Sequence, residues 1–475
     1  MQSLARRQRA LAAIRPPPRG EGPAGGEELG ERKQMHPAQQ AAKMTVAKPT
    51  NFQPESGMHL KSILNRVYHH PGFVYSGFEL TERGSIKLLV SVKPRRGSKP
   101  RCSGCNRKGP GYDTLPERYF EFIPLWGILV LFLYAMRRVD CPCCGVTVET
   151  VPWANGKSTL TKAYAYFLAA WAKRMSWAEV ARAFNTSWES VFRSVKMVVA
   201  WGLAHRCLDE VRSIGVDEVL WLQGKFLTVV YQIDEGTRRL LWVGRERTVK
   251  TMLRFFRQFG RERAAALRFV CSDMWQPYLK VIAKKAKQAI HVLDRFHIMA
   301  NMNKQIDEVR RQEAKELKAK GLGEVLKGAR WTLLKRPENR TAKQDVKLAE
   351  LVRYNLRAVR SHLLREEFQF FWTYLSPHWA GIFLDRWCTK VMRSKLEPMK
   401  KTARSLRNHK ALILNWFRAR GQVSTGAVEG LNNKLKVITR RAFGFRTYDA
   451  VETALYHALG DLPDPAEQEF THRFY

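Results

Sequence analysis

The chain has 475 residues, with 82 Lys and Arg against 43 Asp and Glu, and its formal net charge at pH 7 is +39. Hydrophobic residues make up 45% of it and aromatic residues 11%, which suffices for several buried cores and excludes a chain that is disordered throughout. Such a charge opposes compaction unless a polyanion binds. Nucleic acid is therefore the first expected partner, and an anionic membrane surface is the second.

The first part of the chain, residues 1–57, is rich in Arg, Pro, Gly, Ala and Gln and lacks an apolar period, so we predict a disordered basic extension. The longest apolar run, Phe122 to Met136, contains Pro124 and Gly127. It is shorter than the roughly 18 residues that span a bilayer. We therefore interpret this run as a strand and expect no membrane partner.

Two cysteine pairs with C-x-x-C spacing predict a β-rich zinc-binding domain over residues 58–155. The pairs are Cys102 with Cys105 and Cys141 with Cys144. Four thiolates form a closed tetrahedral site, in which Zn²⁺ stabilises the fold and does not catalyse. A β-hairpin must bring the two pairs together. The role of Cys143 is ambiguous, and incidental thiols are the alternative to a metal site.

Residues 156–208 have the pattern of a helix-turn-helix DNA-binding domain. Ser176 and Glu179 form a capping-box pattern at the start of one helix, and a second helix begins near Ser187. The second helix would present Arg193 and Lys196 to a DNA groove. An ordinary helical hairpin is the alternative, and the basic charge of the chain favours the DNA-binding interpretation.

Residues 209–300 contain strand and helix patterns in the order βββαβαβ, which is the order of a ribonuclease-H-like fold. We therefore predict an α/β protein in which this segment is the first part of a catalytic core. The expected strands are residues 214–220, 226–233, 240–243, 267–273 and 289–294, and the expected helices are residues 250–260 and 278–287.

Carboxylates in this segment have the arrangement that nucleic-acid phosphoryl transfer requires. Two Mg²⁺ ions about 3.5–4 Å apart need carboxylate oxygens from several segments. Asp217 and Asp273 are expected to meet on adjacent parallel strands. The third candidate is Glu429, because twelve Lys and Arg but no other acid lie between Pro398 and Tyr448. A solvated helix with an ordinary salt bridge at Glu429 is the alternative.

Glu429 opens a predicted helix in the last segment, residues 425–475. Helical spacing places Glu429, Asn432, Asn433, Lys436 and Arg440 along one face. One metal ligand followed by groups for phosphate and sugar contacts is the expected content of that face.

Residues 301–424 are predicted to be a helical insertion, with 28 basic and 12 acidic residues. Long helical periods run over residues 302–320 and 342–365. Its tryptophans are expected to pack the core of the insertion, although a few could stack on flipped bases. They are Trp331, Trp372, Trp379, Trp387 and Trp416.

Asp294 and His297 lie next to the predicted site. Asp294 ends a strand and is a further candidate metal ligand, whereas pairing with Arg295 is the alternative. His297 is an auxiliary candidate that could position a phosphate or an attacking hydroxyl.

The combination of motifs resembles the DDE transposases of bacterial insertion sequences, specifically the ISL-three family. The resemblance covers roughly residues 60–465. It rests on the two cysteine pairs, the helix-turn-helix and five further stretches, which are residues 215–218, 272–274, 294–297, 428–436 and 440–446.

The resemblance implies a catalytic triad of Asp217, Asp273 and Glu429 that uses Mg²⁺ or Mn²⁺, with the helical insertion before the final Glu. We expect the enzyme to bind the terminal inverted repeats of its element, cleave there and join the freed end to target DNA. Arg440, Arg441 and Arg446 are expected to contact DNA. A homo-oligomeric synaptic complex in the bacterial cytoplasm, associated with the nucleoid, is also expected.

Three other functions compete with this prediction. A DNA-binding regulator derived from a transposase would have an idle catalytic domain, but such a domain has no reason to keep all three carboxylates. A structure-specific nuclease without strand transfer has the same sequence features. An RNA-binding protein is disfavoured, because no aromatic sheet motif of the RNA-recognition type is visible.

Overall fold

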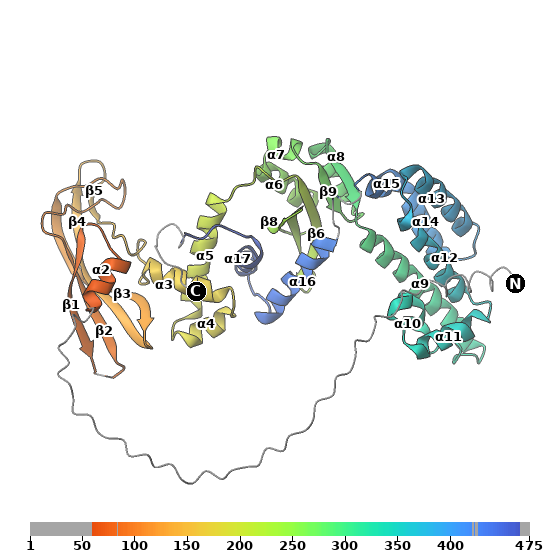
Figure 1. Ribbon diagram of the computed structural model, residues 1–475, viewed down its shortest axis with the longest axis horizontal. Coiled ribbons are helices and arrows are strands. Elements are labelled where there is room, and N and C mark those ends of the chain that lie inside the picture. Colours follow the sequence, from red (N-terminus) through yellow and green to blue (C-terminus); the bar gives the residue numbers. More distant parts are fainter. Residues whose placement is uncertain (1–58, 83, 420–421, 423–425, 466–475) are drawn as a thin grey trace, which may run out of the picture. The chain divides into compact units, whose positions relative to one another are not determined.

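The computed structural model describes residues 59–82, 84–419, 422 and 426–465. The predicted extension, residues 1–57, lies outside the described residues. The described chain is a mixed α/β protein with two separate five-stranded sheets and many helices, in agreement with the predicted fold class at this level (Figure 1). Within these ranges, no helix is long and apolar enough to cross a membrane.

The first sheet occupies the segment that carries the cysteine pairs. Helix α2 (Leu60–Val67) precedes it, and its strands are β1 (Phe73–Thr81), β2 (Lys87–Pro94), β3 (Gly111–Leu125), β4 (Ile128–Cys141) and β5 (Gly145–Val148). The strand order is β1-β2-β4-β3, with β5 paired to β4. Strands β2 and β4 run parallel, and the other pairs are antiparallel.

The apolar run Phe122 to Met136, which was predicted to be one strand, is divided between two strands. It contains the end of β3, a turn and most of β4, because Trp126 and Gly127 reverse the chain with φ angles of 52° and 78°. Both halves of the run then pack together, and the rings of Phe122 and Phe132 stack with centroids 4.6 Å apart. A single strand was the wrong interpretation, since the glycine permits a tight turn.

Three helices follow the first sheet, and they are α3 (Lys162–Ala172), α4 (Trp177–Ala183) and α5 (Trp188–His205). The capping box at the start of α4 is confirmed. The Glu179 backbone N–H donates to Ser176 Oγ at 3.3 Å, and the Ser176 backbone N–H donates to Glu179 Oε2 at 2.8 Å. Ser187 caps α5 in the same way through the N–H of Ser190. The predicted pair of helices with a short turn is therefore present.

The second sheet has the predicted order of elements, βββαβαβ, with one additional short helix. Its strands are β6 (Ser213–Leu222), β7 (Lys225–Asp234), β8 (Thr237–Arg245), β9 (Phe269–Ser272) and β10 (Ile290–Leu293), and its helices are α6 (Val249–Phe259), α7 (Arg261–Ala265) and α8 (Gln276–Lys285). The spatial order is β10-β9-β6-β7-β8. Strands β6, β7 and β8 pair antiparallel, whereas β9 is parallel to both β6 and β10.

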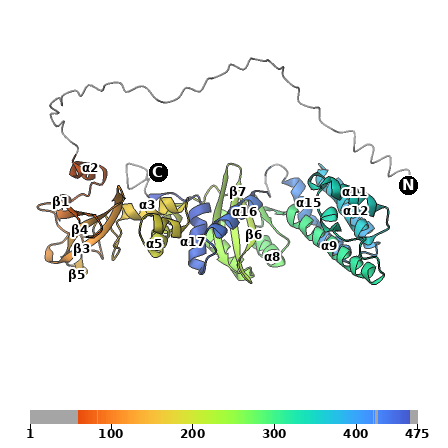
Figure 2. The ribbon, with the colours of Figure 1, turned by 90° about the horizontal axis from the view of Figure 1, so that it is seen from below.

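The insertion is helical, as predicted. It contains α9 (Arg295–Ala319), α10 (Ala329–Leu334), α11 (Ala342–Val352), α12 (Arg357–Gln369), α13 (Pro377–Met392), α14 (Glu397–Asn408) and α15 (Lys410–Arg418), with two 3-10 turns at Pro337–Asn339 and Phe370–Thr373. The predicted boundary at residue 301 falls inside α9. This helix begins directly after β10 and is continuous (Figure 2).

Residues 342–365, which have one helical period in the sequence, form two helices, α11 and α12. The buried carboxylate of Glu313 on α9 accepts hydrogen bonds from the backbone N–H groups of Arg357 and Ala358, at 2.7 and 2.8 Å. A carboxylate at this position satisfies free N–H groups of a new helix start. Tertiary contact thus fixes the break, which helical periodicity does not show.

The tryptophans of the insertion divide into two groups. Trp387 is buried in the core and donates its indole N–H to the Leu364 carbonyl, and Trp372 and Trp416 pack against the same core. For these three the predicted core role is confirmed. It is wrong for Trp331 and Trp379, whose side chains are exposed.

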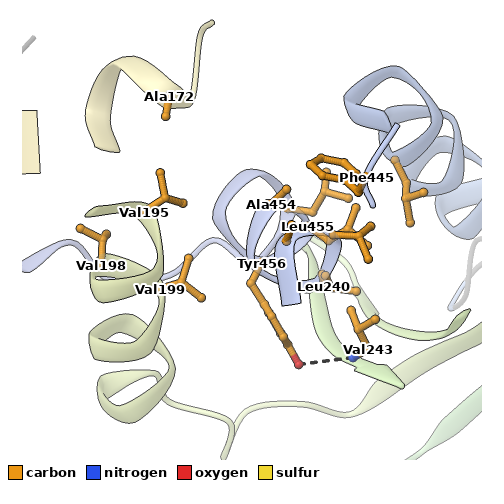
Figure 3. Packing of buried hydrophobic residues seen from close by; sticks show 14 of the residues in the cluster. Ala172, Val195, Val198, Val199, Leu240, Val243, Phe445, Ala454, Leu455 and Tyr456 are labelled. Carbon is orange, nitrogen blue, oxygen red and sulfur yellow. Dashed lines mark hydrogen bonds between the residues drawn. The ribbon is translucent and has the colours of Figure 1, made fainter. Parts of the chain in front are cut away.

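Helices α16 (Gly426–Arg441) and α17 (Tyr448–Leu459) return the chain to the second sheet. One hydrophobic cluster combines residues of α3–α5, of the second sheet and of α16–α17. Figure 3 shows part of this cluster, with Val195 on α5, Leu455 and Tyr456 on α17, and Leu240 on β8. The backbone N–H of Val243 donates to the Tyr456 hydroxyl at 3.3 Å. The helix pair and the second sheet therefore share a core.

Candidate active site and metal centre

Three aspartates follow one another across the parallel strands of the second sheet. Gly215 of β6 pairs with Cys271 of β9, and Leu293 of β10 pairs with Ser272. Continuing both registers places Asp217, Asp273 and Asp294 in one row across the sheet. The backbone N–H of Asp294 donates to the Ser272 carbonyl at 2.9 Å, so the pairing extends to the end of β10.

The carboxylate of Asp217 is held in a fixed orientation by two hydrogen bonds. The backbone N–H of Glu218 donates to Oδ1 at 2.7 Å, and Nδ2 of Asn432 donates to Oδ2 at 2.5 Å. The buried hydroxyl of Tyr231 on β7 donates in turn to Oδ1 of Asn432 at 2.9 Å. Asp217 itself is only 8% exposed. Two linked side chains, those of Asn432 and Tyr231, therefore orient this carboxylate from one side.

Helix α16 reaches Asp217 because a glycine of β6 lets it approach. A Cβ atom at Gly215 would lie 2.3 Å from Cγ2 of Val428, a distance that real side chains do not allow. Val428 precedes Glu429, which is exposed in the first turn of α16. The close packing of α16 on β6 thus brings the first turn of α16, with Glu429, toward the row of aspartates.

The predicted DNA contact of Asn432 is wrong in this arrangement. Asn432 is buried, and its amide is engaged by Asp217 and Tyr231. Its carbonyl and one of its two N–H groups are bonded inside the protein, and burial keeps the other N–H away from a phosphate at the surface. Asn432 positions Asp217, and the sequence prediction missed Tyr231 because a tyrosine on a core strand has the pattern of a packing residue.

The carboxyl groups of the row disfavour one another's charge. The pKa of Asp294 is raised to about 6, mainly by burial and also by the charges of Asp217 and Glu429. The hydrogen bond from the Phe296 N–H and the neighbouring His297 act in the opposite direction. Burial also raises the pKa of Asp273, with the charge of Asp217 in the same direction. Such repulsion is what a bound cation relieves.

Asp294 and His297 stand at the start of α9. Oδ1 of Asp294 accepts the backbone N–H of Phe296 at 2.8 Å and caps this helix. Nε2 of His297 lies 4.0 Å from Oδ2 of Asp217. The alternative of an ion pair between Asp294 and Arg295 is not found among the ion pairs of the described residues. His297, the auxiliary candidate, therefore lies beside Asp217.

Glu218 and Arg247 form an ion pair beside the row that the sequence did not indicate. Nη1 of Arg247 lies 2.8 Å from Oε2 of Glu218, and the guanidinium lies over the rings of Phe226 and Trp275. Burial raises the pKa of Glu218, with the charge of Asp273 in the same direction. A glutamate directly after Asp217 was the one signal in the sequence that could have drawn attention to this pair.

The four predicted cysteines meet in space. Among the described residues, the one set of at least three His, Cys, Asp or Glu whose ligand atoms all lie within 4.8 Å of one another is Cys102, Cys105, Cys141 and Cys144. Asp217, Asp273 and Glu429 form no set as tight as this. The donor types nevertheless differ as expected: thiolates suit Zn²⁺, and carboxylate oxygens suit Mg²⁺ or Mn²⁺.

The hairpin of β3 and β4 brings the cysteine pairs together, as predicted. Sγ of Cys105 lies 3.5 Å from Sγ of Cys141, and the backbone N–H of Gly104 donates to Sγ of Cys102 at 3.3 Å. The neighbouring thiol of Cys105 is the largest influence that raises the pKa of Cys144 to about 12. A bound cation would offset the repulsion between thiolates at this distance, so the four cysteines are compatible with a structural metal site.

Cys143 lies outside the cluster of four thiols. Nη1 of Arg107 donates to its Sγ at 3.2 Å, and its side chain is exposed. The ambiguity over this cysteine is thereby removed.

The basic residues predicted to bind DNA lie on two helices. On α5, Arg193 pairs with Glu189 and Lys196 pairs with Asp449 of α17, each at 2.5 Å. The predicted DNA contacts on and after α16 that are exposed are Asn433, Lys436, Arg440, Arg441 and Arg446. Arg441 also donates to the Arg174 carbonyl at 3.0 Å. Both groups retain exposed cations, and a phosphate would compete with the surface acids for Arg193 and Lys196.

Comparison with known proteins identifies the family of the chain. A sequence model of the ISL3 type of DDE enzymes, described as a transposase family, matches residues 214–455. The chain is 30% identical over 416 residues to the transposase for insertion sequence element IS1557 of Mycobacterium tuberculosis, in an alignment that covers 81% of this chain and 92% of that protein. It is 28% identical over 379 residues to the transposase for insertion sequence element IS1001 of Bordetella parapertussis, covering 79% and 92%.

The fold, the carboxylates and these relatives define an enzyme of DNA transposition, a DDE transposase. Within that class the chain belongs to the ISL3 family, as the motifs of its sequence indicate. DNA is therefore its partner, and divalent metal ions belong to the chemistry of the class.

Proposed function

We propose that this transposase binds the terminal inverted repeats of its insertion sequence, hydrolyses a strand at each element end and joins the freed 3′-hydroxyl to target DNA. Two copies or more would hold the two ends in a synaptic complex, in the bacterial cytoplasm at the nucleoid. The catalytic triad is Asp217, Asp273 and Glu429, on a ribonuclease-H-like core. Asp294 is a further ligand candidate, and His297 an auxiliary group.

The hydrogen bond from Asn432 to Asp217 carries this proposal. It joins the helix of Glu429 to the strand of Asp217, although a helical insertion separates them in sequence. The sheet order β10-β9-β6-β7-β8, with three antiparallel strands and two parallel ones, supports the ribonuclease-H-like assignment. The common row of Asp217, Asp273 and Asp294 supports their joint role at one site.

The carboxylates of the row would hold Mg²⁺ or Mn²⁺. When bound there, these ions supply charge neutralisation and activation of oxygen nucleophiles for phosphoryl transfer. Asp217 is oriented by Asn432 and the N–H of Glu218, so it meets a ligand without rearrangement. His297, 4.0 Å from Asp217, is placed to position a phosphate oxygen or a hydroxyl.

The other parts of the chain would hold DNA. Zn²⁺ bound by Cys102, Cys105, Cys141 and Cys144 would fix the first sheet, and α4 with α5 would form the helix-turn-helix. Exposed cations on α5 and α16 would contact phosphates and fix the register of the duplex. The binding should weaken steeply with salt, because phosphate contacts release counterions.

Cleavage and strand transfer assays with duplexes of the element's own ends test this proposal. The ends are read from imperfect inverted repeats in the DNA that flanks the gene. Wild-type enzyme should nick the intact end in Mg²⁺ and join a pre-cut end to a second duplex. Asp217→Asn and Glu429→Gln should bind the ends and perform neither step, and Glu235→Gln, in the exposed turn after β7, should do both.

Retained nicking by Asp217→Asn or Glu429→Gln would overturn the triad. Nicking of intact ends without joining of pre-cut ends would favour a structure-specific nuclease. Binding of ends without either reaction by the wild type would favour an idle regulator.

A further inference from the structure

A phenylalanine occupies the backbone position at which helices usually end in glycine. After α16, the N–H of Gly444 donates to the Thr439 carbonyl and the N–H of Phe443 donates to the Arg440 carbonyl, both at 2.9 Å. This pair of bonds is the Schellman arrangement, whose left-handed residue is usually Gly and sometimes Asn. Here that residue is Phe443, with a φ of 53°.

Burial does not account for this choice. Phe443 is 99% exposed, so its ring contributes nothing to the hydrophobic core. A bulky side chain in the left-handed region is strained, and such strain persists mainly at functional sites. The described chain has one similar case, Trp126, which is 87% exposed with a φ of 52° in the turn between β3 and β4.

Phe443 borders a cavity of about 720 Å³ between α4 and the segment that joins α16 to α17. Other aromatic rings line the same cavity: Trp177, Trp188 and Phe445. The ring centroid of Trp177 lies 5.6 Å from that of Trp188 and 5.9 Å from that of Phe445. A cavity of this volume accommodates a nucleotide-sized ligand, and aromatic walls bind bases of any sequence by stacking.

Charged groups around the cavity suit a nucleic acid. Arg182, Arg441 and Arg446 line it, against one acid, Glu179, whose carboxylate accepts hydrogen bonds from Ser176. The guanidinium groups are exposed, so they can reach phosphates on either side of an inserted base.

We propose that Phe443 unstacks one base pair of the bound DNA and that the cavity beside it receives the displaced base. The exposed ring of Trp188 stacks on this base, and Trp177 and Phe445 form the wall behind that ring. Arg182, Arg441 and Arg446 hold the adjoining phosphates. This inference rests on the proposed function, because it assumes that the duplex bound at Glu429 continues along α16.

The length of α16 gives the position of the displaced base. Fourteen residues separate Glu429 from Phe443, which corresponds to about 21 Å of helix at about 1.5 Å per residue. A duplex rises about 3.4 Å per base pair. The displaced base should therefore lie within about six base pairs of the scissile phosphate.

A scan with abasic sites tests this inference on the full chain. The probes are duplexes of the element end in which an abasic site stands opposite each base in turn, and a matched set with an unrelated target sequence. Removal of the pairing partner lowers the cost of displacing a base. Wild-type protein should bind one probe about tenfold more tightly than the intact duplex. Tighter binding to an abasic probe of the end set alone would show that the displaced base belongs to the inverted repeat. Tighter binding to an abasic probe of the target set would show that it belongs to target DNA.

Two variants separate the role of the ring from folding. Phe443→Gly removes the ring and relieves the backbone strain, so its unfolding temperature should equal or exceed that of the wild type, while it binds intact ends more weakly and loses the preferred abasic position. Trp126→Gly makes the same backbone change at the other exposed aromatic residue and should keep the wild-type scan.

A flat scan by the wild type, or an unchanged scan by Phe443→Gly, would overturn the inference. Dissociation of an oligomer by Phe443→Gly together with a flat scan would overturn it in favour of an interface with a second copy. Nicking of intact ends by the same wild-type preparation reports separately on the proposed function. A flat scan with normal nicking refutes the base cavity alone. A flat scan together with absent nicking refutes both the base cavity and the proposed function.

Discussion

Nδ2 of Asn432 donates a hydrogen bond of 2.5 Å to Oδ2 of Asp217, across 215 positions of sequence. The bond links the helix that carries Glu429 to the strand that carries the first aspartate of the site. Asn432 is itself held by the hydroxyl of Tyr231. The orientation of Asp217 therefore depends on correct docking of a helix that follows the entire insertion.

Replacement of Asn432 by Ala should lower the rate of end cleavage by about 10–100-fold, the usual effect of losing a group that orients a metal ligand. End binding should remain within about twofold, because the side chain is buried. Asn433→Ala, at the exposed neighbour, should show the opposite pattern, with weaker binding and normal cleavage at saturating DNA. Equal cleavage rates for Asn432→Ala and wild type would show that the bond does not serve catalysis.

A methyl group at Gly215 should separate α16 from β6, because it would lie 2.3 Å from Val428. We expect Gly215→Ala to reduce the free energy of unfolding by about 1–3 kcal/mol, as overpacking does, and to abolish cleavage although all carboxylates remain. Gly430→Ala is the matched control, since a Cβ there meets no atom within 4 Å. This helix variant should be neutral or more stable by about 0.5–1 kcal/mol. Thermal unfolding and nicking assays measure both.

The cluster of four thiols should bind one zinc ion per chain. Cys144→Ser should release that zinc and weaken end binding, because the first sheet loses its metal cross-link. Cys143→Ser should keep the metal, since its Sγ lies outside the cluster. Metal analysis of the purified variants decides this, and equal zinc contents for Cys143→Ser and Cys144→Ser at one per chain would contradict the site.

Protonation of Asp294 should make the stability of the metal-free protein depend on pH. Its folded pKa of about 6 lies above the ordinary value of 3.8, so the folded state binds the proton more tightly than the unfolded state. The stabilisation from this group is complete below about pH 4 and is lost as pH rises to about 6. Relative to wild type, Asp294→Asn should gain at most about 3 kcal/mol between these values. Parallel unfolding curves across this range would contradict it.

Local patterns were sufficient to predict most elements of the second sheet and the pair of cysteine knuckles. Short runs of apolar and β-branched residues located β6 and β7, and the spacing of cysteines located the four thiols, because both signals arise from neighbours in sequence. Even the capping box of Ser176 and Glu179 was visible, since its two partners are three residues apart.

Features that depend on distant contacts were not predicted. Asn432 looked like a DNA contact because helical spacing places it near Glu429, but spacing does not reveal that Tyr231 and Asp217 enclose it. The break between α11 and α12 is capped by Glu313 from another helix. Long-range hydrogen bonds of this kind leave no periodic signal in one sequence.

The most direct measurement of the central claim replaces an oxygen ligand by sulfur. If Asp217 binds the catalytic metal, Asp217→Cys should fail to cleave element ends in Mg²⁺ and recover cleavage in Mn²⁺, because a thiolate suits softer ions better than Mg²⁺. Glu235→Cys should cleave equally in both ions. Equal cleavage by Asp217→Cys in Mg²⁺ and Mn²⁺, at the wild-type rate, would contradict the account.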